Sequence, residues 1–365
     1  MLVISKEILK CINDAGYKAY MVGGVVRDYL LGNDTIDVDI CTSATPKELL
    51  EIFPMATPHI EYGCVKLFYK EVNFEITTFR VEKKYENRRP VEIEYVTSLE
   101  KDLARRDFTI NTLCMDCDGN IIDILGAKAD LNKKILRCVS NPDKKFSEDP
   151  LRILRGIRFS ANLGFKIEKD TLKAIKKNKK LLNNISYNKK REELDKIFAS
   201  KKCSAAINLI KRLKLDKELE LKGISKLKIS DNILIMWVQL DCIDKYPFSN
   251  NEKDQIEKIR YLINNRKNLI DNYVIYKYGA YLTCSVDKIY GGKNIDKINI
   301  INSNLAINSS KDIDISVDEI IELIKREKGS WISELIKDLE RQIVNNKLEN
   351  NKNKIKEYLI KRYIN

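Results

Sequence analysis

The chain has 365 residues, 44% hydrophobic and 33% charged, which predicts a globular protein with room for more than one domain and argues against a mainly disordered one. No apolar stretch reaches the roughly 18 to 20 residues of a membrane span, and the first residues lack a small-residue cleavage site, so we expect a cytoplasmic protein without membrane contact. Lys and Arg exceed Asp and Glu by a formal charge of +13, which favours a polyanion, nucleic acid first, as partner.

The first third of the chain predicts an α/β domain. Apolar side chains at helical spacing mark the first 20 residues, "KAYMVGG" reads as a strand entering a glycine turn, and "VVRDYLLG" reads as a short helix closed by Gly32. Four runs rich in β-branched and aromatic residues follow, and we expect them to be strands of one sheet: "IDVDICT", "CVKLFYK", "VNFEITTFRV" and "VEIEYV".

From about residue 147 onward the pattern is mainly helical. "SEDPLRILRGIRFSANLGF" and "KKREELDKIFAS" carry helical periodicity, whereas residues 215–300 mix Asn, Lys and Ile in runs compatible with helix or irregular structure. The last 50 residues again predict amphipathic helices, with a turn at Gly329.

The nine cysteines and the single histidine argue against two kinds of chemistry. The cysteines show no paired framework, so reduced thiols are expected. Cys114 and Cys117 form one CxxC, but no second pair follows at zinc-finger spacing, and His59 is the only histidine. Structural metal sites and His-dependent catalysis are therefore disfavoured.

Two aspartates, Asp37 and Asp39, stand one residue apart in a predicted strand and so share one side of it. Adjacent carboxylates repel unless a cation joins them, and carboxylates with substrate phosphates are the ligands that Mg²⁺ prefers. Alone, the pair is better explained as part of a polar surface strand. Together with the glycine turn at Gly23 and Gly24 and the following Arg27, the pair favours a site for a nucleotide and a metal ion.

Two further features have competing explanations. Glu75, in the strand-like "NFEITTF", could be a third carboxylate and general base, but an exposed strand Glu explains it nearly as well. Arg105, Arg106 and Asp107 would suit a triphosphate or a ribose hydroxyl, and a surface charge cluster fits them equally.

The segment "SEDPLRILRGIRF" predicts a helix with Ser147 as N-cap and Pro150 in its first turn. Four charged residues recur every third position and should face a cleft, because apolar residues occupy the other faces: Asp149, Arg152, Arg155 and Arg158. Cytosine and adenine both present an amino donor beside a ring-nitrogen acceptor. Asp149 could accept from the amino group while Arg152 donates to the ring, which would reject guanine and uracil.

In order and spacing, these motifs resemble the tRNA nucleotidyltransferase and poly(A) polymerase family, specifically its bacterial-type CCA-adding enzymes. The resemblance rests on "GGVVRDYLLG" with "DVDICTSATP", then "EITTFR", "RRDFTIN" and "EDPLRILRGIRF", and it extends into the C-terminal region. It implies an α/β nucleotidyltransferase head with a small mixed sheet at residues 1–140. An all-α neck (141–205), body (206–302) and tail (303–365) would follow and grip tRNA.

The resemblance also implies an enzyme that adds C, C and A to tRNA 3′ ends from CTP and ATP, with Mg²⁺ as cofactor. Asp37 and Asp39 would hold the metal and Glu75 would be the third catalytic carboxylate. The nucleotide would be bound by Gly24, Arg27, Arg106, Asp149, Arg152, Arg155 and Arg158. A specialist adding only CC or only A, a poly(A) polymerase, and an RNA-binding protein on a transferase fold remain alternatives. No motif bears on the oligomeric state.

Three stretches depart from the family pattern. The stretch from Asp123 to Ala127 lacks the expected proline and one glycine, so its hinge is expected to differ. Asn188 and Lys189 replace the usual Glu-Arg, which puts the contacts of that helix in question. The loop "KKYENRRP", whose counterpart bears on addition of the final A, is about one residue short but keeps Arg88, Arg89 and Pro90.

Overall fold

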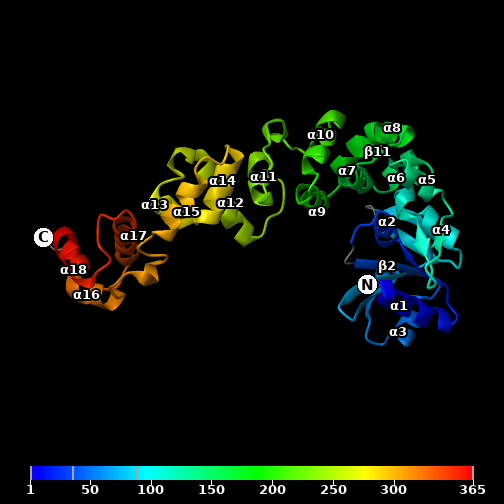
Figure 1. The fold of residues 1–365 in the computed structure, drawn as a ribbon, viewed down its shortest axis with the longest axis horizontal. Helices are drawn as coiled ribbons and strands as arrows, with labels where there is room; N and C mark the ends of the chain where they lie inside the picture. Colours follow the sequence, from blue (N-terminus) through cyan, green and yellow to red (C-terminus); the bar gives the residue numbers. More distant parts are fainter. Residues whose placement is uncertain (1, 35–36, 87–88, 364–365) are drawn as a thin grey trace. The chain divides into compact units, whose positions relative to one another are not determined.

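The computed structural model describes residues 2–34, 37–86 and 89–363 (Figure 1). It divides into two compact units, Met1–Leu221 and Lys222–Asn365. The described residues contain no helix that combines the length and apolar composition needed to cross a membrane.

In the described part of the chain, seven strands of the first unit form one mixed sheet in the order β3-β4-β5-β2-β1-β8-β9. The pairing of β2 with β5 is parallel, and the other neighbours pair antiparallel. The strands are β1 (Ala19–Val22), β2 (Asp37–Thr42), β3 (Thr57–His59), β4 (Cys64–Tyr69), β5 (Val72–Thr78), β8 (Cys114–Met115) and β9 (Ile121–Ile122).

Helices α1 (Leu2–Asp14) and α3 (Pro46–Ile52) cover one face of this sheet (Figure 1). Their apolar residues, among them Leu9 and Leu49, pack with Ile40 and Phe74 of the strands in one core cluster. Helix α2 (Gly24–Leu30) follows β1 directly. On the other face, Leu103 of α4 (Leu99–Ala104) joins a small apolar cluster with Val22, Cys41 and Cys114. Asp39 and Glu75 are exposed on that face, so this part of it is open to solvent.

The expectation that the four strand-like runs form one sheet is wrong. The run "VNFEITTFRV" is divided at Phe79, a fully buried residue, and the chain continues as β6 (Arg80–Glu86). Strand β6 pairs only with β7 (Arg89–Tyr95), in a separate two-stranded sheet among the described residues. Arg88 lies outside the described residues, as do the side chains of Arg89 and Pro90.

After the head sheet the first unit is mainly helical. A two-stranded parallel pair, β10 (Ile135–Leu136) with β11 (Lys166–Ile167), lies among these helices. The helices are α5 (Ala127–Asn132), α6 (Pro142–Glu148), α7 (Leu151–Leu163), α8 (Lys169–Asn178), α9 (Tyr187–Phe198) and α10 (Cys203–Leu213).

The second unit is helical throughout its regular elements, which resolves the ambiguity of residues 215–300. Its helices are α11 (Ile233–Gln239), α12 (Asn250–Asn264), α13 (Asn272–Tyr278), α14 (Ala280–Ile289), α15 (Ile295–Ser303), α16 (Val317–Ile324), α17 (Trp331–Val344) and α18 (Lys352–Tyr363). Short 3₁₀ turns complete the two units: η1 (Ile60–Tyr62), η2 (Thr109–Asn111), η3 (Lys179–Asn184), η4 (Ile224–Lys226), η5 (Arg266–Asn268) and η6 (Ser310–Asp312). The mixed head sheet followed by helices confirms the predicted fold class.

Local contacts explain how two of the stretches that differ from the family pattern fold. The carboxylate of Asp123 accepts hydrogen bonds from the backbone nitrogens of Ala127 and Lys128, at 2.8 and 2.9 Å, and so begins α5. Lys189 pairs with Glu192 one turn later, at 2.6 Å, within a regular α9. None of the nine cysteines, all of which lie in the described ranges, is part of a disulfide.

Candidate active site

Three of the predicted carboxylates lie on the open face of the head sheet. Along β2, Val38 and Ile40 are buried toward α1 and α3, so the alternate residues Asp37 and Asp39 point to the opposite side. The parallel register of β2 and β5 places Asp39 directly beside Glu75. The strand pattern therefore brings all three side chains to one face.

The electrostatics of this face favour a bound cation. Loss of solvent raises the pKa of Asp39, Glu75 raises it further, and Arg106 acts in the opposite direction. Among the described residues, no three His, Cys, Asp or Glu side chains form a group that could hold a metal ion. Mg²⁺ is usually held by one or two carboxylates together with water and substrate phosphates. Asp37 and Asp39 therefore fit a magnesium site that is completed by a nucleotide.

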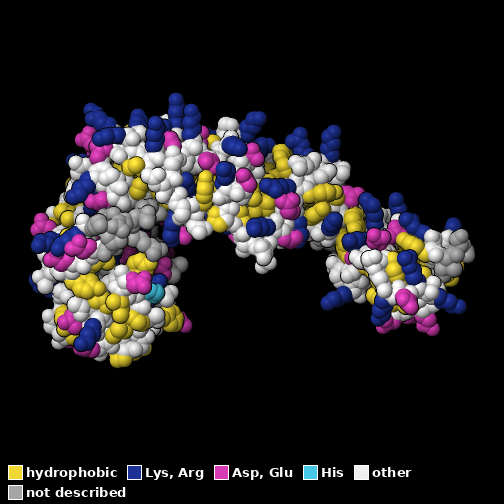
Figure 2. Space-filling model, turned by 180° about the vertical axis from the view of Figure 1, so that it is seen from behind, with side chains coloured by type: hydrophobic (Ala, Val, Ile, Leu, Met, Phe, Trp, Pro, Cys, Tyr) yellow, Lys and Arg dark blue, Asp and Glu magenta, His cyan; other side chains and the backbone are white. Residues whose placement is uncertain are grey.

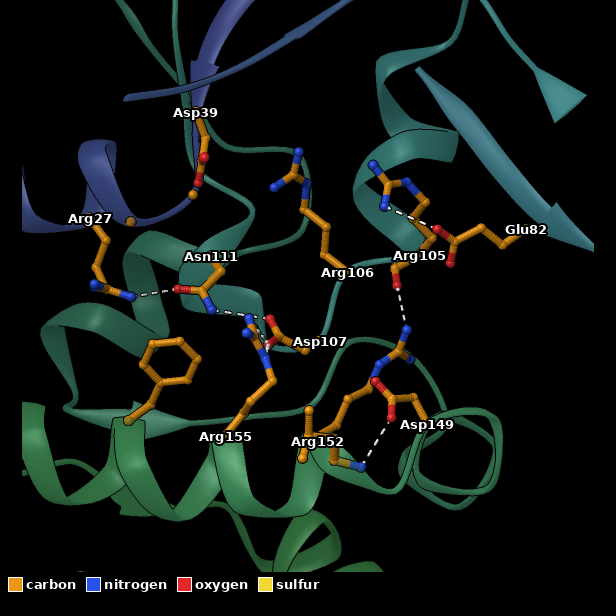
Figure 3. Close-up of a pocket in the computed structure, with 14 residues that line it drawn as sticks. Arg27, Asp39, Glu82, Arg105, Arg106, Asp107, Asn111, Asp149, Arg152 and Arg155 are labelled. Carbon is orange, nitrogen blue, oxygen red and sulfur yellow. Dashed lines mark hydrogen bonds and ion pairs between the residues drawn. The ribbon is translucent and has the colours of Figure 1, made fainter. Parts of the chain in front are cut away.

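A cavity of about 480 Å³ opens beside these carboxylates (Figure 3). It brings together seven of the predicted residues from separate elements: Gly24, Arg27, Asp39, Arg106, Asp149, Arg152 and Arg155. Arg105 and Asp107 line it as well. Its described lining does not include Asp37, Glu75 or Arg158. Five arginines line this space, and Asp39 is the one metal-site carboxylate that reaches it. Such a lining suits a nucleoside triphosphate with its bound cation.

Sequence reasoning missed four lining residues: Glu82, Asn111, Leu151 and Phe159. Glu82 stands two residues after Arg80, on the same side of β6, which is a weak sequence signal. Asn111 ends the motif "RRDFTIN", and a single neutral amide gives no charge pattern that would mark it as a site residue. Leu151 and Phe159 are among the apolar residues that the helical pattern places on the buried side of "LRILRGIRF", but both line the cavity.

The glycine turn lies where the carboxylates meet the arginines. Gly23 has a φ of 79°, which favours glycine. A Cβ atom there would lie 3.6 Å from a guanidinium nitrogen of Arg106 and 3.7 Å from a carboxylate oxygen of Asp39. The missing side chain therefore leaves this corner of the cavity open to a ligand.

A chain of polar contacts joins α2 to α7 across the cavity. Arg27 donates to the Asn111 side-chain oxygen at 2.6 Å, and the Asn111 amide donates to Asp107 at 3.0 Å. Asp107 also accepts from the Arg155 Nε at 2.7 Å. Burial would raise the pKa of Asp107, but the charge of Arg155 and hydrogen bonds from its neighbours lower it to about 2. Asp107 is thus a permanent anion that orients Arg155.

Arg105 and Arg106 are held by a buried carboxylate. Asp102 is fully buried and lies 2.9 Å from the Arg105 Nε and 3.2 Å from a terminal nitrogen of Arg106. The Nε of Arg106 is buried and has no hydrogen-bond partner among the described residues. A buried donor of this kind is costly unless a ligand satisfies it, which supports a role for Arg106 in binding.

The predicted helix of the base-reading residues is interrupted. Helix α6 ends at Glu148, and Asp149 has φ −141° and ψ 96°, because a residue before proline is disfavoured in the helical region. Ser147 is therefore not an N-cap; its hydroxyl donates to the Lys144 carbonyl at 2.8 Å. Instead the Asp149 carboxylate accepts from the Leu151 nitrogen at 3.0 Å and caps α7.

Arg152 and Arg158 have different surroundings on α7. Arg152 lines the cavity and donates to the Arg105 carbonyl at 3.4 Å, which anchors it to the head. Arg158 pairs with the buried Glu193 of α9 at 2.9 Å and lies over the Phe159 ring, 4.5 Å from its centroid. The structure thus brings Asp149 and Arg152 together and leaves Arg158 in contact with α9.

Three family models match successive parts of the chain. One described as "Poly A polymerase head domain" matches residues 19–137, and one for the "RNA and SrmB- binding site of polymerase A" matches residues 164–221. A third, for domain 2 of tRNA nucleotidyltransferases, matches residues 239–359. The order of these matches follows the order of the motifs in the sequence.

Curated relatives and solved structures agree with these matches. The chain is 33% identical to the CCA-adding enzyme of Bacillus pumilus, over 96% of this chain and 95% of the relative, and 34% identical to that of Oceanobacillus iheyensis, over 98% and 96%. The Bacillus stearothermophilus CCA-adding enzyme in complex with CTP has a TM-score of 0.88 and 27% identity, covering 98% of this chain and 96% of that one. These similarities span almost the whole of each protein, and the chain belongs to the family of CCA-adding enzymes, the bacterial-type tRNA nucleotidyltransferases.

Proposed function

We propose that this protein is an Mg²⁺-dependent enzyme that adds C, C and A to the 3′ end of tRNA from CTP and ATP and releases pyrophosphate. The observation that carries the proposal is the single cavity that has Asp39 at one end and Asp149 with Arg152 at the other. An RNA-binding protein needs positive charge, but it needs neither a pair of metal-binding carboxylates nor a base-reading pair.

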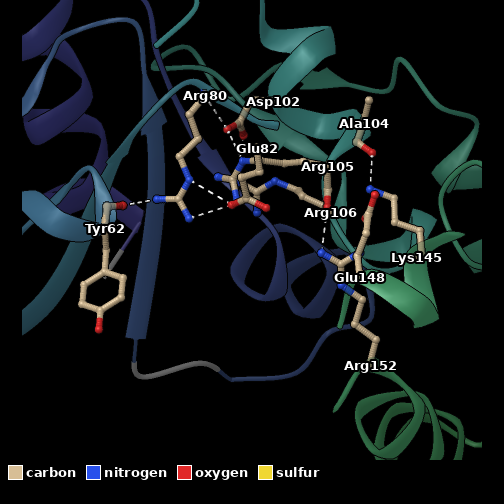
Figure 4. Close-up of polar contacts among 10 residues, drawn as sticks. All are labelled: Tyr62, Arg80, Glu82, Asp102, Ala104, Arg105, Arg106, Lys145, Glu148 and Arg152. Carbon is tan, nitrogen blue, oxygen red and sulfur yellow. Dashed lines mark hydrogen bonds and ion pairs between the residues drawn. The ribbon is translucent and has the colours of Figure 1, made fainter. Parts of the chain in front are cut away.

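The nucleotide is selected by two side chains from the junction of α6 and α7. Asp149 accepts from the exocyclic amino group of cytosine or adenine, and Arg152 donates to the adjacent ring nitrogen. The Arg152 side chain donates to the Arg105 carbonyl at 3.4 Å (Figure 4), so a residue of the head helps to orient this guanidinium. Guanine and uracil present the reverse order of donor and acceptor and are rejected.

The phosphates lie toward the opposite end of the cavity. Arg27, Arg106 and Arg155 supply the positive charge there, and Gly24 lets the backbone approach the ligand. Asp37 and Asp39 would hold Mg²⁺, which would neutralise charge on the reacting phosphate. Glu75 accepts the proton of the attacking 3′-hydroxyl, consistent with its place beside Asp39. Arg158 acts by supporting α7 through Glu193.

In this enzyme residues 1–140 form the head, 141–205 the neck, 206–302 the body and 303–365 the tail. The head and neck supply the cavity, and the body and tail bind tRNA. Lys and Arg side chains are numerous on the visible surface of the helical parts of both units (Figure 2), in line with the formal charge of +13. Positive charge of this kind attracts a phosphate backbone irrespective of sequence.

One experiment tests the function and separates its alternatives. Purified protein is given tRNAs that end before CCA, after C or after CC, with each nucleoside triphosphate alone and with all four, and the 3′ ends are sequenced. We expect C on the first two ends and A on the third. Addition of only C or only A would identify a specialist, and repeated addition of A would identify a poly(A) polymerase. If the protein bound tRNA but added no nucleotide, it would be an RNA-binding protein and not an enzyme.

A further inference from the structure

A separate cavity, of about 580 Å³, lies among α7, α8, α10 and strand β11 of the first unit (Figure 1). Its described lining shares no residue with that of the nucleotide cavity. Arg155 and Phe159 of α7 line the nucleotide cavity, whereas Ser160 and Ala161 line this one. At 3.6 residues per turn these two pairs point to opposite sides of the helix. The second space, here called the α7–α10 cavity, is therefore distinct from the nucleotide cavity.

The apolar part of the α7–α10 cavity is mainly aliphatic. It is formed by the side chains of Ala161, Ile167, Leu172, Ala205 and Leu209. Phe165 is the only aromatic residue in the described lining, and it is 4% exposed, so little of its ring is available to a ligand. Recognition of an unstacked base commonly uses an accessible aromatic ring. The lining therefore suits an aliphatic group better than a nucleobase.

Three cations, Lys166, Lys202 and Arg212, line the same cavity, and its described lining contains no acidic residue. None of the three side chains forms an ion pair with a carboxylate in the described ranges. By contrast, Lys173 on the neighbouring α8 pairs with Asp170 at 3.1 Å. A cleft lined by charges of one sign attracts ions of the opposite sign. The cavity therefore favours an anion.

Helix α10 presents one of its faces to the cavity. The lining residues recur every three or four positions, from the N-cap to the last turn: Lys202, Ala205, Asn208, Leu209 and Arg212. At about 1.5 Å per residue, the two cations stand roughly 15 Å apart along the helix axis. The small or aliphatic side chains lie between them. This face can therefore accommodate an extended apolar chain with a charged group at one end.

The end of α7 places two lysines at one end of the cavity. Gly164 closes α7 with a φ of 71°, and a Cβ atom there would lie 3.4 Å from the Lys202 Nζ. Lys166 follows Gly164 by two residues. The carbonyl end of α7 carries only a partial negative charge, so most of the charge of Lys202 is left for a ligand. These two amines suit the carboxylate or phosphate of an anion.

We propose that the α7–α10 cavity binds an acyl or alkyl anion. Its carboxylate or phosphate lies at Lys166 and Lys202, and its chain lies along Ala205 and Leu209. The inference goes beyond the proposed function and does not depend on it, because the nucleotide cavity contributes no residue to this site. Each buried methylene group of such a chain strengthens binding by about fourfold.

Calorimetric titration of the full protein tests the proposal. Decyl phosphate and decanoate are the probes, and CTP is present in excess so that the arginines of the nucleotide cavity are occupied. We expect one site for at least one probe, and the comparison of the two distinguishes a phosphate from a carboxylate head group. Hexyl phosphate or hexanoate should bind at least tenfold more weakly. Absence of binding by both probes, or equal binding of inorganic phosphate and decyl phosphate, would overturn the proposal.

Variants locate the site. Ala205→Trp should abolish binding by filling the cavity, and Ala205 is exposed, so the fold should persist. Lys202→Met should weaken binding by about tenfold, the effect of losing one charge-assisted contact, and Lys202→Arg should restore most of it. Lys201→Met is the matched control, because Lys201 is exposed and is not among the lining residues. Circular dichroism checks the fold of each variant.

Two results with these variants would contradict the proposal. Unchanged affinity in both Ala205→Trp and Lys202→Met would place the probe elsewhere on the protein. An equal loss in Lys201→Met and Lys202→Met would indicate attraction to the general positive charge instead of a built site. CCA addition is measured separately, so a failure of the proposed function would leave this test unaffected.

Discussion

One carboxylate oxygen of Asp107 accepts from two nitrogens of Arg155, Nε and a terminal nitrogen, each at 2.7 Å. Asp107 belongs to the loop after α4, and Arg155 belongs to α7. This ion pair therefore joins the head to the helix that carries Arg152, and its strength bears on both stability and nucleotide binding.

Replacing Asp107 with Asn should destabilise the first unit at neutral pH. The folded-state pKa of about 2 lies below the unfolded value, so the carboxylate contributes about 2 kcal/mol above roughly pH 4, and this contribution is lost as the pH falls toward 2. Calorimetric unfolding of wild type and Asp107→Asn should therefore differ at pH 7 and converge in acid. Both tryptophans, Trp237 and Trp331, lie in the second unit, so their fluorescence would not report this change. Asp118→Asn, at an exposed position, is the control.

Removing either candidate metal ligand should abolish chemistry and leave RNA binding intact. Asp37→Ala or Asp39→Ala should lower CMP incorporation by about a thousandfold or more, since a metal contributes several kcal/mol to the stability of the transition state. Both residues are on the exposed face of β2, so the fold should persist. Filter binding of tRNA and incorporation with and without a chelator measure the two effects. An unchanged rate in both variants would refute the metal assignment.

Exchanging the base-reading pair should change the choice of nucleotide. The double variant Asp149→Arg with Arg152→Asp reverses the order of acceptor and donor, so relative kcat/KM should shift from CTP and ATP toward GTP and UTP. Because Asp149 caps α7, the exchange should also cost about 1 kcal/mol of stability. Asp149→Asn keeps a capping side chain and separates the two effects. Uniformly reduced use of all four nucleotides would argue against base reading.

The stability of the first unit should rise as the pH increases into the alkaline range, because the buried Lys145 then loses its proton. Lys145 is almost fully buried and donates to the Ala104 carbonyl at 2.8 Å. Burial and then Arg152 lower its pKa to about 8, against weaker opposing effects from Glu148, Cys138 and Glu82. Because the unfolded lysine remains charged to about pH 10, the cost of burying its charge is present below pH 8 and is relieved as the pH rises.

The matched variants Lys145→Met and Lys145→Arg test this dependence. Wild type should gain stability relative to Lys145→Met, by up to about 3 kcal/mol, between pH 7 and pH 10. Lys145→Arg stays charged and should show no such gain over the same range. Urea unfolding followed by circular dichroism at three pH values is sufficient. Parallel pH curves for wild type and Lys145→Met would contradict a depressed lysine pKa.

Short-range patterns predicted much of the site. Alternation along "DVDI" placed Asp37 and Asp39 on one side because successive strand residues face opposite ways, and the structure shows that pattern of burial. The break before α7 also had a local signal, since Pro150 restricts Asp149, but the helical pattern on both sides hid it. Such features depend on a few neighbouring residues and can be read directly from the chain.

Contacts between distant segments could not be read in this way. Nothing local in the sequence indicates that β6 leaves the main sheet or that Glu82 joins Arg80 to Arg105, because these contacts depend on how separate segments pack. The sequence by itself determined which side of each strand and helix is polar, through residue periodicity. Only the tertiary structure decided that Glu75 pairs with both Asp39 and Lys66, because strand order and register are set by burial over the whole sheet.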